Sequence, residues 1–189
     1  MLYSEVAATY EAMEGTAKRL ELTQLLADLI LKTPNELLDK VIYLTQGKIY
    51  PDFMGIEMGL ADRMGMRAIA ATSGWSLKEV GKKYHLFGDI GSVAEDLLKH
   101  KGQVTLFSKP LTVKRIYDVF NSIAKASGPG SLELRLRLLN SILADASPKE
   151  ARYIMRTATG NLRLGIADYT FLDALAVAFT NDKGNRPII

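Results

Sequence analysis

The sequence predicts an all-α fold: a single compact multi-helix domain with an internal duplication and an approximate two-fold axis. Three observations support this prediction. Apolar residues recur at helical spacing, and the alternation typical of strands is nearly absent. Serine or threonine stands three residues before glutamate at four places, which is the pattern of a helix capping box. Short motifs also recur in the same order in two parts of the chain.

We expect about nine or ten helices. Capping boxes predict helix starts at Thr33–Glu36, Ser76–Glu79, Ser92–Glu95 and Ser147–Glu150. Two of them place proline at the first helical position, where its missing N–H costs nothing. Glycines that can adopt a left-handed conformation predict helix ends at Gly47, Gly74, Gly102, Gly128 and Gly160.

The internal repeat consists of four matches in the same order. Residues 6–18 match 113–125, 20–22 match 132–134, 33–36 match 147–150, and 59–62 match 165–168. We divide the chain into a first repeat at 1–62, inserted helices at 63–108, a second repeat at 109–180, and the start of a linker at 181–189. Two similar halves packed together would have an approximate two-fold axis, as duplex nucleic acid does.

The composition excludes several classes of chemistry. The 189 residues include no cysteine and only two histidines, which rules out disulfides, thiolate metal sites and a cysteine nucleophile. No nucleophile–base pair stands out, so we assign no catalytic residue, no metal site and no cofactor to this chain. No apolar run approaches the roughly 20 residues of a membrane span. The N-terminus lacks the layout of a signal peptide, and we expect a soluble intracellular protein.

Charge is unevenly distributed. The net charge is +3, but residues 1–62 carry five basic and ten acidic residues, whereas residues 109–165 carry ten basic and four acidic ones. This asymmetry favours an anionic partner for the second half. Ordinary solvated helix faces are the alternative explanation.

The turn at 127–131 is one candidate phosphate-binding loop. Gly128 and Gly130 leave the backbone open, and Ser131 is expected to be the N-cap of the following helix. A helix N-terminus carries unpaired N–H donors and a partial positive charge, which together favour phosphate. Arg135 lies one turn further on and could add its guanidinium.

The second candidate loop is 160-GNLRLG-165. Gly160 is expected to end one helix and Gly165 to precede the next, so the backbone between them can approach another molecule closely. Two leucines would anchor the loop and leave Arg163 pointing outward. Arginine suits phosphate oxygens or a narrow minor groove. The alternative is a buried Arg163 that caps carbonyls of the helix ending near Gly160.

The first half cannot bind an anion in the same way. Glu57 occupies the position that matches Arg163, and a carboxylate would repel phosphate. We expect the first half to contribute Thr16, Lys18 and Arg19 instead, just before its own Leu-Glu-Leu helix.

These motifs resemble a known family. GNLRLGIADYTFLDALAVAF, SGPGSLELRLRLL, SPKEARYIMR, KRLELTQLLADLI, GIEMGLAD and GDIGSVAEDLL look like the N-terminal DNA-binding domain of archaeal and eukaryotic ATP-dependent DNA ligases. The resemblance implies a helical domain that grips the minor groove on both sides of a nick in double-stranded DNA, in replication and repair. It implies DNA contacts from Arg19, Gly128, Gly130, Ser131, Gly160, Asn161 and Arg163. Asn161 stands where some relatives have lysine.

The resemblance also implies partners. Archaeal relatives bind a sliding clamp (PCNA-type) through a short segment here occupied by 103-QVTLF-107, which offers Gln103, Leu106 and Phe107. The alternative for this segment is an extended linker with Phe107 in the core. The family's adenylation motif, Lys-x-Asp-Gly, is absent from these residues. We therefore expect ATP, Mg²⁺, and the adenylation and OB domains to belong to a longer parent, and this fragment to be inactive alone.

The resemblance places the protein in the cytoplasm of an archaeon, or in the nucleus of a eukaryote. A second hypothesis from the residues themselves is a helical protein-interaction scaffold without affinity for DNA. In that case 103–107 would be the main functional feature.

Overall fold

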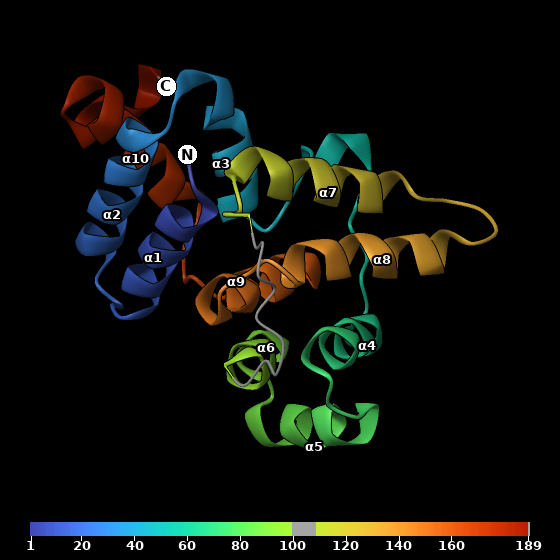
Figure 1. The fold of residues 1–189 in the computed structure, drawn as a ribbon. Coiled ribbons are helices and arrows are strands. Elements are labelled where there is room, and N and C mark those ends of the chain that lie inside the picture. Colours follow the sequence, from blue (N-terminus) through green and yellow to red (C-terminus); the bar gives the residue numbers. More distant parts are fainter. Residues whose placement is uncertain (100–108, 189) are drawn as a thin grey trace.

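The computed structural model describes residues 1–99 and 109–188, and it is all-α within them (Figure 1). The α-helices are α1 Tyr3–Glu14, α2 Arg19–Lys32, α3 Leu38–Thr45, α4 Asp62–Ser73, α5 Leu77–Phe87, α6 Ile90–Leu98, α7 Val113–Lys125, α8 Ser131–Leu143, α9 Pro148–Ala158 and α10 Asp168–Thr180. Short 3-10 helices are η1 Asn35–Leu37, η2 Asp52–Met54 and η3 Lys183–Ile188. None of the described helices is both long and apolar enough to cross a membrane.

The starts of α1 and α7 pair with each other. Leu2 and Thr112, the N-cap residues of the two helices, form an isolated antiparallel bridge. The Tyr3 amide donates to the Leu111 carbonyl at 2.8 Å, and the Val113 amide donates to the Met1 carbonyl at 3.3 Å. Two helices that begin from one antiparallel pair are related by a local two-fold axis.

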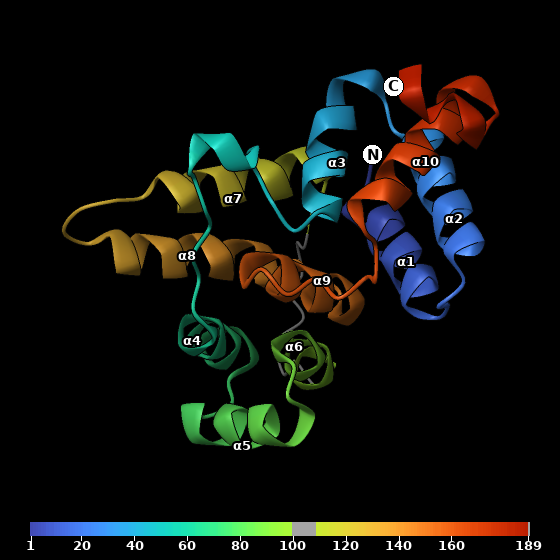
Figure 2. The same cartoon turned by 180° about the vertical axis from the view of Figure 1, so that it is seen from behind.

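Helix packing follows the same relation. If α1–α4 correspond to α7–α10, then the packing of α2 against α10 is the counterpart of that of α8 against α4 (Figures 1 and 2). In the same way, α1 packs against α9 as α7 packs against α3. We keep the internal duplication as a proposal, which these paired contacts support.

The helix boundaries differ from the predicted limits of the two repeats. The helix starts align Tyr3 with Val113, one helical turn away from the sequence match between Val6 and Val113. The proposed boundary after residue 62 coincides with the first residue of α4. A first repeat that matched the second helix for helix would extend to Ser73.

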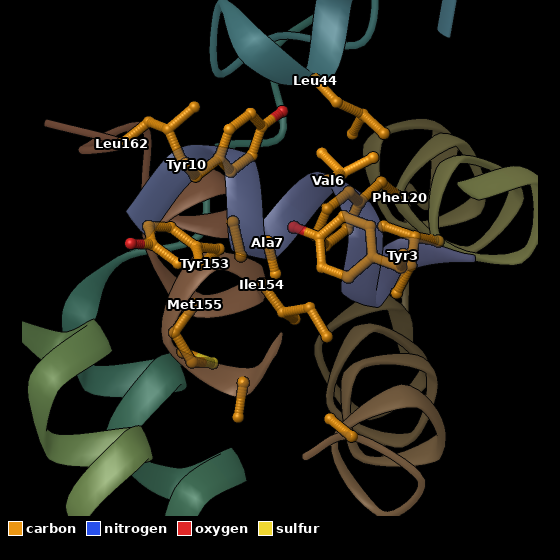
Figure 3. Close-up of a cluster of buried hydrophobic side chains, with 14 of the residues drawn as sticks. Tyr3, Val6, Ala7, Tyr10, Leu44, Phe120, Tyr153, Ile154, Met155 and Leu162 are labelled. Atoms are coloured by element: carbon orange, nitrogen blue, oxygen red, sulfur yellow. The ribbon is translucent and has the colours of Figure 1, made fainter. Parts of the chain in front are cut away.

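The core lies between the two halves. In Figure 3, Val6 and Tyr10 of α1 lie among Phe120 of α7, Leu44 of α3 and Tyr153 of α9. The Tyr10 and Tyr153 rings meet edge to face at 5.4 Å, and the Tyr10 hydroxyl shares a hydrogen bond with Thr45 Oγ1 at 2.9 Å. Burial of apolar surface is the main favourable term in folding, and here both halves contribute it jointly.

Two of the four predicted capping boxes are confirmed. Ser76 and Ser147 each accept from the amide three residues on, and the glutamate there accepts from the serine amide. The box at Thr33 is wrong, because α2 runs to Lys32 and the Thr33 hydroxyl donates back to the Leu29 carbonyl at 2.7 Å.

The box at Ser92 is also wrong. Asp89 is the N-cap of α6, and its carboxylate accepts from the amides of Gly91 and Ser92. Glu95 ion-pairs with Arg152 instead.

Most of the predicted helix ends are confirmed. Gly74 is the left-handed C-cap of α4, and Gly47 and Gly160 lie just past α3 and α9 with φ of 71° and 74°. Gly128 has a φ of 79° but lies three residues beyond α7, which ends at Lys125. Gly102 lies outside the described residues.

Candidate nucleic-acid interface

The loop at 160–165 is built by a helix end. The Asn161 amide donates to the Arg156 carbonyl at 2.9 Å and the Gly160 amide donates to the Thr157 carbonyl at 3.2 Å. This pair of bonds is a Schellman motif, which needs a left-handed residue at the position of Gly160. Leu162 and Leu164 are buried, and Leu162 points into the central core (Figure 3).

Arg163 is exposed between these two leucines, with a φ of 58°. A positive φ costs about 1–2 kcal/mol for a residue with a Cβ. Strain of this kind is found at functional sites. The exposed position contradicts the alternative of a buried arginine. Gly165, two residues further on, also has a positive φ, of 67°, which glycine adopts without strain.

The Arg163 side chain reaches the end of another helix. Its Nη2 donates to the Gly88 carbonyl at 3.1 Å, and Gly88 is the left-handed C-cap of α5. Tyr84, one turn before Gly88 in α5, donates its hydroxyl to the Asp62 carboxylate at the start of α4. The hydrogen bond to Asp62 and burial raise the pKa of Tyr84, and the positive charge of Arg163 opposes this only in part.

A buried ionic cluster lies behind this loop. Arg156 of α9 donates to both carboxylate oxygens of Asp89, and it also donates to Glu14 of α1 at 2.6 Å. Burial opposes ionisation of Asp89, but bonds from Arg156 and Ser92 outweigh it, and its pKa falls to about 2. The cluster fixes the end of α9, where the loop begins.

Sequence reasoning missed this cluster. The predicted helix start at Ser92–Glu95 gave Asp89 no role. The available signal was Arg156, which directly follows the apolar run 153-YIM-155 in a predicted helix. An arginine on a buried face requires an acid, although the sequence does not say which one.

The turn between α7 and α8 differs from expectation in one respect. Gly130, with a φ of 81°, is the N-cap of α8, so Ser131 is the first helical residue and the predicted Ser131 N-cap is wrong. The Ser131 amide donates to the Gly128 carbonyl at 3.2 Å, and the N-cap Gly130 has no side chain to cap the helix. In the part of the chain that the structure describes, no backbone bond engages the amides of Leu132 and Glu133.

Arg135 supports that turn from within. Its Nη2 donates to the Ala126 carbonyl at 2.7 Å, at the C-cap of α7. The side chain is half-buried. A direct contact between Arg135 and an anion therefore stays a prediction, and the observed bond shows that Arg135 holds α8 to the end of α7.

The first-half residues have acidic partners. Lys18 Nζ lies 2.7 Å from Glu21, and the Thr16 hydroxyl donates to the same carboxylate at 2.5 Å. Hydrogen bonds from Lys18 and Thr16 lower the pKa of Glu21. Arg19, the first residue of α2, ion-pairs with Asp173 of α10 at 2.7 Å and is more than half exposed.

The predicted residues do not converge on one pocket. The α7–α8 turn and the α1–α2 turn lie at opposite ends of the molecule, and 160–165 lies between them (Figure 2). The loop lines a depression of about 420 Å³ with Thr45, Gln46, Lys48, Ile166, Ala167, Asp168 and Phe171. Candidate binding residues that are spread over the surface in this way suit an extended ligand rather than a small molecule.

The segment that matches 160–165 in the first half lies on the same face. Figure 2 shows 55–61 crossing in front of α8 and 160–167 crossing in front of α9. Gly55 and Gly59 have φ of 63° and 54°, and Glu57 is exposed between them as Arg163 is exposed in the second half. The two segments thus present opposite charges.

The residues predicted to bind a sliding clamp have no structural description. Gln103, Leu106 and Phe107 lie outside the described residues. Within the described ranges, no group of three or more histidines or acids has a geometry that could hold a metal ion.

The fold and these loops define an all-helical module with glycine-opened turns on its surface, one of which carries the exposed Arg163. The chain belongs to the family described as "DNA ligase N terminus", whose model matches residues 2–176.

Relatives support this assignment. The chain is 44% identical over 189 residues to a DNA ligase of Nitrosopumilus maritimus and 49% identical over 194 residues to DNA ligase 2 of Thermofilum pendens. It is 38% identical to a probable DNA ligase of Persephonella marina. These alignments cover 99–100% of this chain but only 32% of each relative. The chain therefore corresponds to the N-terminal third of these relatives.

Proposed function

We propose that this chain binds double-stranded DNA without sequence preference, across the minor groove and phosphate backbone at a nick. It does so as the N-terminal module of an ATP-dependent DNA ligase. The single observation that carries the proposal is the exposed Arg163 on a strained loop between two left-handed glycines. A guanidinium held outward by a rigid loop can enter a narrow minor groove or meet phosphate oxygens.

The distribution of the other residues fits a duplex. The open turn at 128–131 leaves amide donors at the start of α8, which suits a phosphate. The turn at 16–19 lies at the other end of the molecule (Figure 1). A module with contacts at both ends and in the middle can span several phosphates of one duplex, and contacts to phosphate carry no sequence information.

Catalysis belongs to the rest of the parent in this proposal. ATP and Mg²⁺ would act in the adenylation domain, and this module would hold the nicked duplex for it and for the OB domain. Binding of a sliding clamp through Gln103, Leu106 and Phe107 is a further part of the proposal.

The test is a titration of a nicked duplex, followed by fluorescence anisotropy at several salt concentrations. With about four to six phosphate contacts, log K should fall against log salt with a slope of about −4 to −5. Arg163→Ala should weaken binding by about 1–2 kcal/mol, and equally on unrelated sequences. Salt-independent binding, or a strong preference for one sequence, would refute the proposal.

A helical scaffold for protein partners predicts the opposite result. Such a scaffold would show no affinity for the duplex at any salt concentration. The segment that would serve it, 103–107, lies outside the described residues, and no observation on the described surface favours it.

A further inference from the structure

A basic pocket lies at the start of α2, away from the Arg163 loop. It has a volume of about 410 Å³ and is lined by residues from α2, α10 and the C-terminal segment: Arg19, Leu20, Thr23, Asp173, Lys183, Gly184, Arg186 and Pro187. Three of these residues are cationic and one is acidic. The pocket is therefore basic, although the C-terminal part of the chain as a whole is not.

One carboxylate serves two of the three cations. Asp173 accepts from Arg19 on Oδ2 at 2.7 Å and from Arg186 on Oδ1 at 3.2 Å. Its side chain is 11% exposed, whereas the side chains of Arg19 and Arg186 are 58% and 41% exposed. Each guanidinium carries five donors, so both keep free N–H groups on the solvent side.

The geometry around Arg186 is held by α10. Its guanidinium lies over the Tyr169 ring at 5.3 Å, in addition to its bond with Asp173. An arginine fixed by an acid and an aromatic ring is pre-organised, so less rotamer freedom is lost when it meets a ligand.

Lys183 adds the third charge. Among the described residues no acidic partner for its side chain is seen within ion-pair distance. The neighbouring Asp182 carboxylate accepts from the Gly184 amide at 2.8 Å and does not line the pocket. The balance of charge at the pocket thus stays positive.

We propose that this pocket binds a phosphodiester phosphate of the duplex, shared by Arg19, Lys183 and Arg186. The inference rests on the proposed function, because that function supplies the polyanion. It adds two DNA-contacting residues, Lys183 and Arg186, from η3. It also means that binding of the duplex holds η3 against α2 and α10.

The first experiment measures nicked-duplex affinity of Lys183→Ala and Arg186→Ala against salt. Each variant should weaken binding about three- to tenfold and make the salt slope shallower by about 0.9. The matched control is Lys32→Ala, which removes the same charge from the exposed opposite end of α2. Its effect should be smaller than that of either pocket variant.

The second experiment uses inorganic phosphate as the probe, in backbone NMR at constant ionic strength. The amide signals of Leu20 and Gly184 should shift saturably in the wild-type chain and in Lys32→Ala, and the shift should be lost in Arg186→Ala. Asp173→Asn should tighten phosphate binding, because it removes the competing carboxylate. A purely structural role of Asp173 predicts no such gain.

The outcomes separate this inference from the proposed function. If Arg163→Ala weakens DNA binding but the two pocket variants behave like Lys32→Ala, the pocket proposal is wrong and the proposed function stands. If the wild-type chain binds no duplex, the proposed function fails and the duplex role of the pocket fails with it. Phosphate shifts that are absent, or that persist in Arg186→Ala, overturn the pocket as a phosphate site.

Discussion

Arg156 and Asp89 form a nearly buried ion pair between α9 and α6. Arg156 Nε lies 3.2 and 3.0 Å from the two carboxylate oxygens, and Nη2 lies 2.7 Å from one of them. The two side chains are 4% and 5% exposed. Because Asp89 is also the N-cap of α6, one carboxylate ties the start of α6 to the end of α9.

This pair predicts a loss of stability in acid. The pKa of Asp89 in the folded chain is about 2, below its usual value of 3.8. Its contribution to the free energy of unfolding is therefore complete above about pH 4 and is lost as the pH falls toward 2, and it amounts to about 2 kcal/mol. Urea unfolding at a series of pH values measures it.

Asp89→Asn provides the comparison for that measurement. The variant should lose about 3–5 kcal/mol at neutral pH, because Arg156 would lack its main counter-charge in a buried site. Its stability should also depend less on pH between 4 and 2. An undiminished acid dependence in the variant would assign the effect to other carboxylates.

Gly91 predicts how closely α6 and α9 must approach. A Cβ at this position would lie 2.6 Å from the Arg152 carbonyl oxygen and 2.7 Å from Arg156 Cγ. Gly91→Ala should therefore destabilise the chain by about 2–3 kcal/mol, as measured by thermal or urea unfolding.

The matched control is Gly81→Ala in α5, where a Cβ would meet nothing within 4 Å. Alanine is the better helix former, so this variant should gain about 0.5–1 kcal/mol. Equal effects of the two substitutions would contradict the packing argument.

Arg163 allows backbone strain to be separated from side-chain function. Its φ of 58° is strained for arginine and alanine alike, but not for glycine. Arg163→Ala should leave stability nearly unchanged, and Arg163→Gly should raise it by up to about 1 kcal/mol. Both should weaken binding of the nicked duplex to the same extent. A glycine variant that retained binding would show that the loop, not the guanidinium, makes the contact.

Glu57 predicts a gain of affinity. Glu57 is exposed, and its segment, which matches the Arg163 loop, crosses the same face of the molecule as that loop (Figure 2). Glu57→Gln should tighten duplex binding about two- to fivefold at low salt, since it removes a charge that repels phosphate. Glu36→Gln, an equal change at an exposed residue of η1, is the control. Similar gains in affinity in both variants would show that the net charge of the chain, and not the position of Glu57, causes the effect.

Local patterns were sufficient where the partners are close in the chain. The capping boxes at Ser76 and Ser147 need only residues within one turn, and both form. The alternation of leucine and arginine between Gly160 and Gly165 likewise predicted two buried leucines and an exposed Arg163, as observed.

The predictions that were wrong or missing depend mostly on partners that are distant in the chain. The sequence indicated Ser92 as a cap, but Arg156, 67 residues away, holds Asp89 in that role. The acceptor of Arg163 is the Gly88 carbonyl, 75 residues away, and no local motif indicates it. Ser131 lost the cap position because Gly130 adopts a left-handed conformation that serine would not readily take.

The packing of α10 on α2, and of α4 on α8, means that each half is closed by the last helix of the other. Neither half encloses its own interior, so a polypeptide cut between them would yield two pieces that are stable only when they reassemble. A single-copy ancestor with this architecture would have existed as a homodimer with exchanged helices. On the proposed duplication, joining two copies in one chain would have left each free to diverge, one toward arginine and the other toward glutamate.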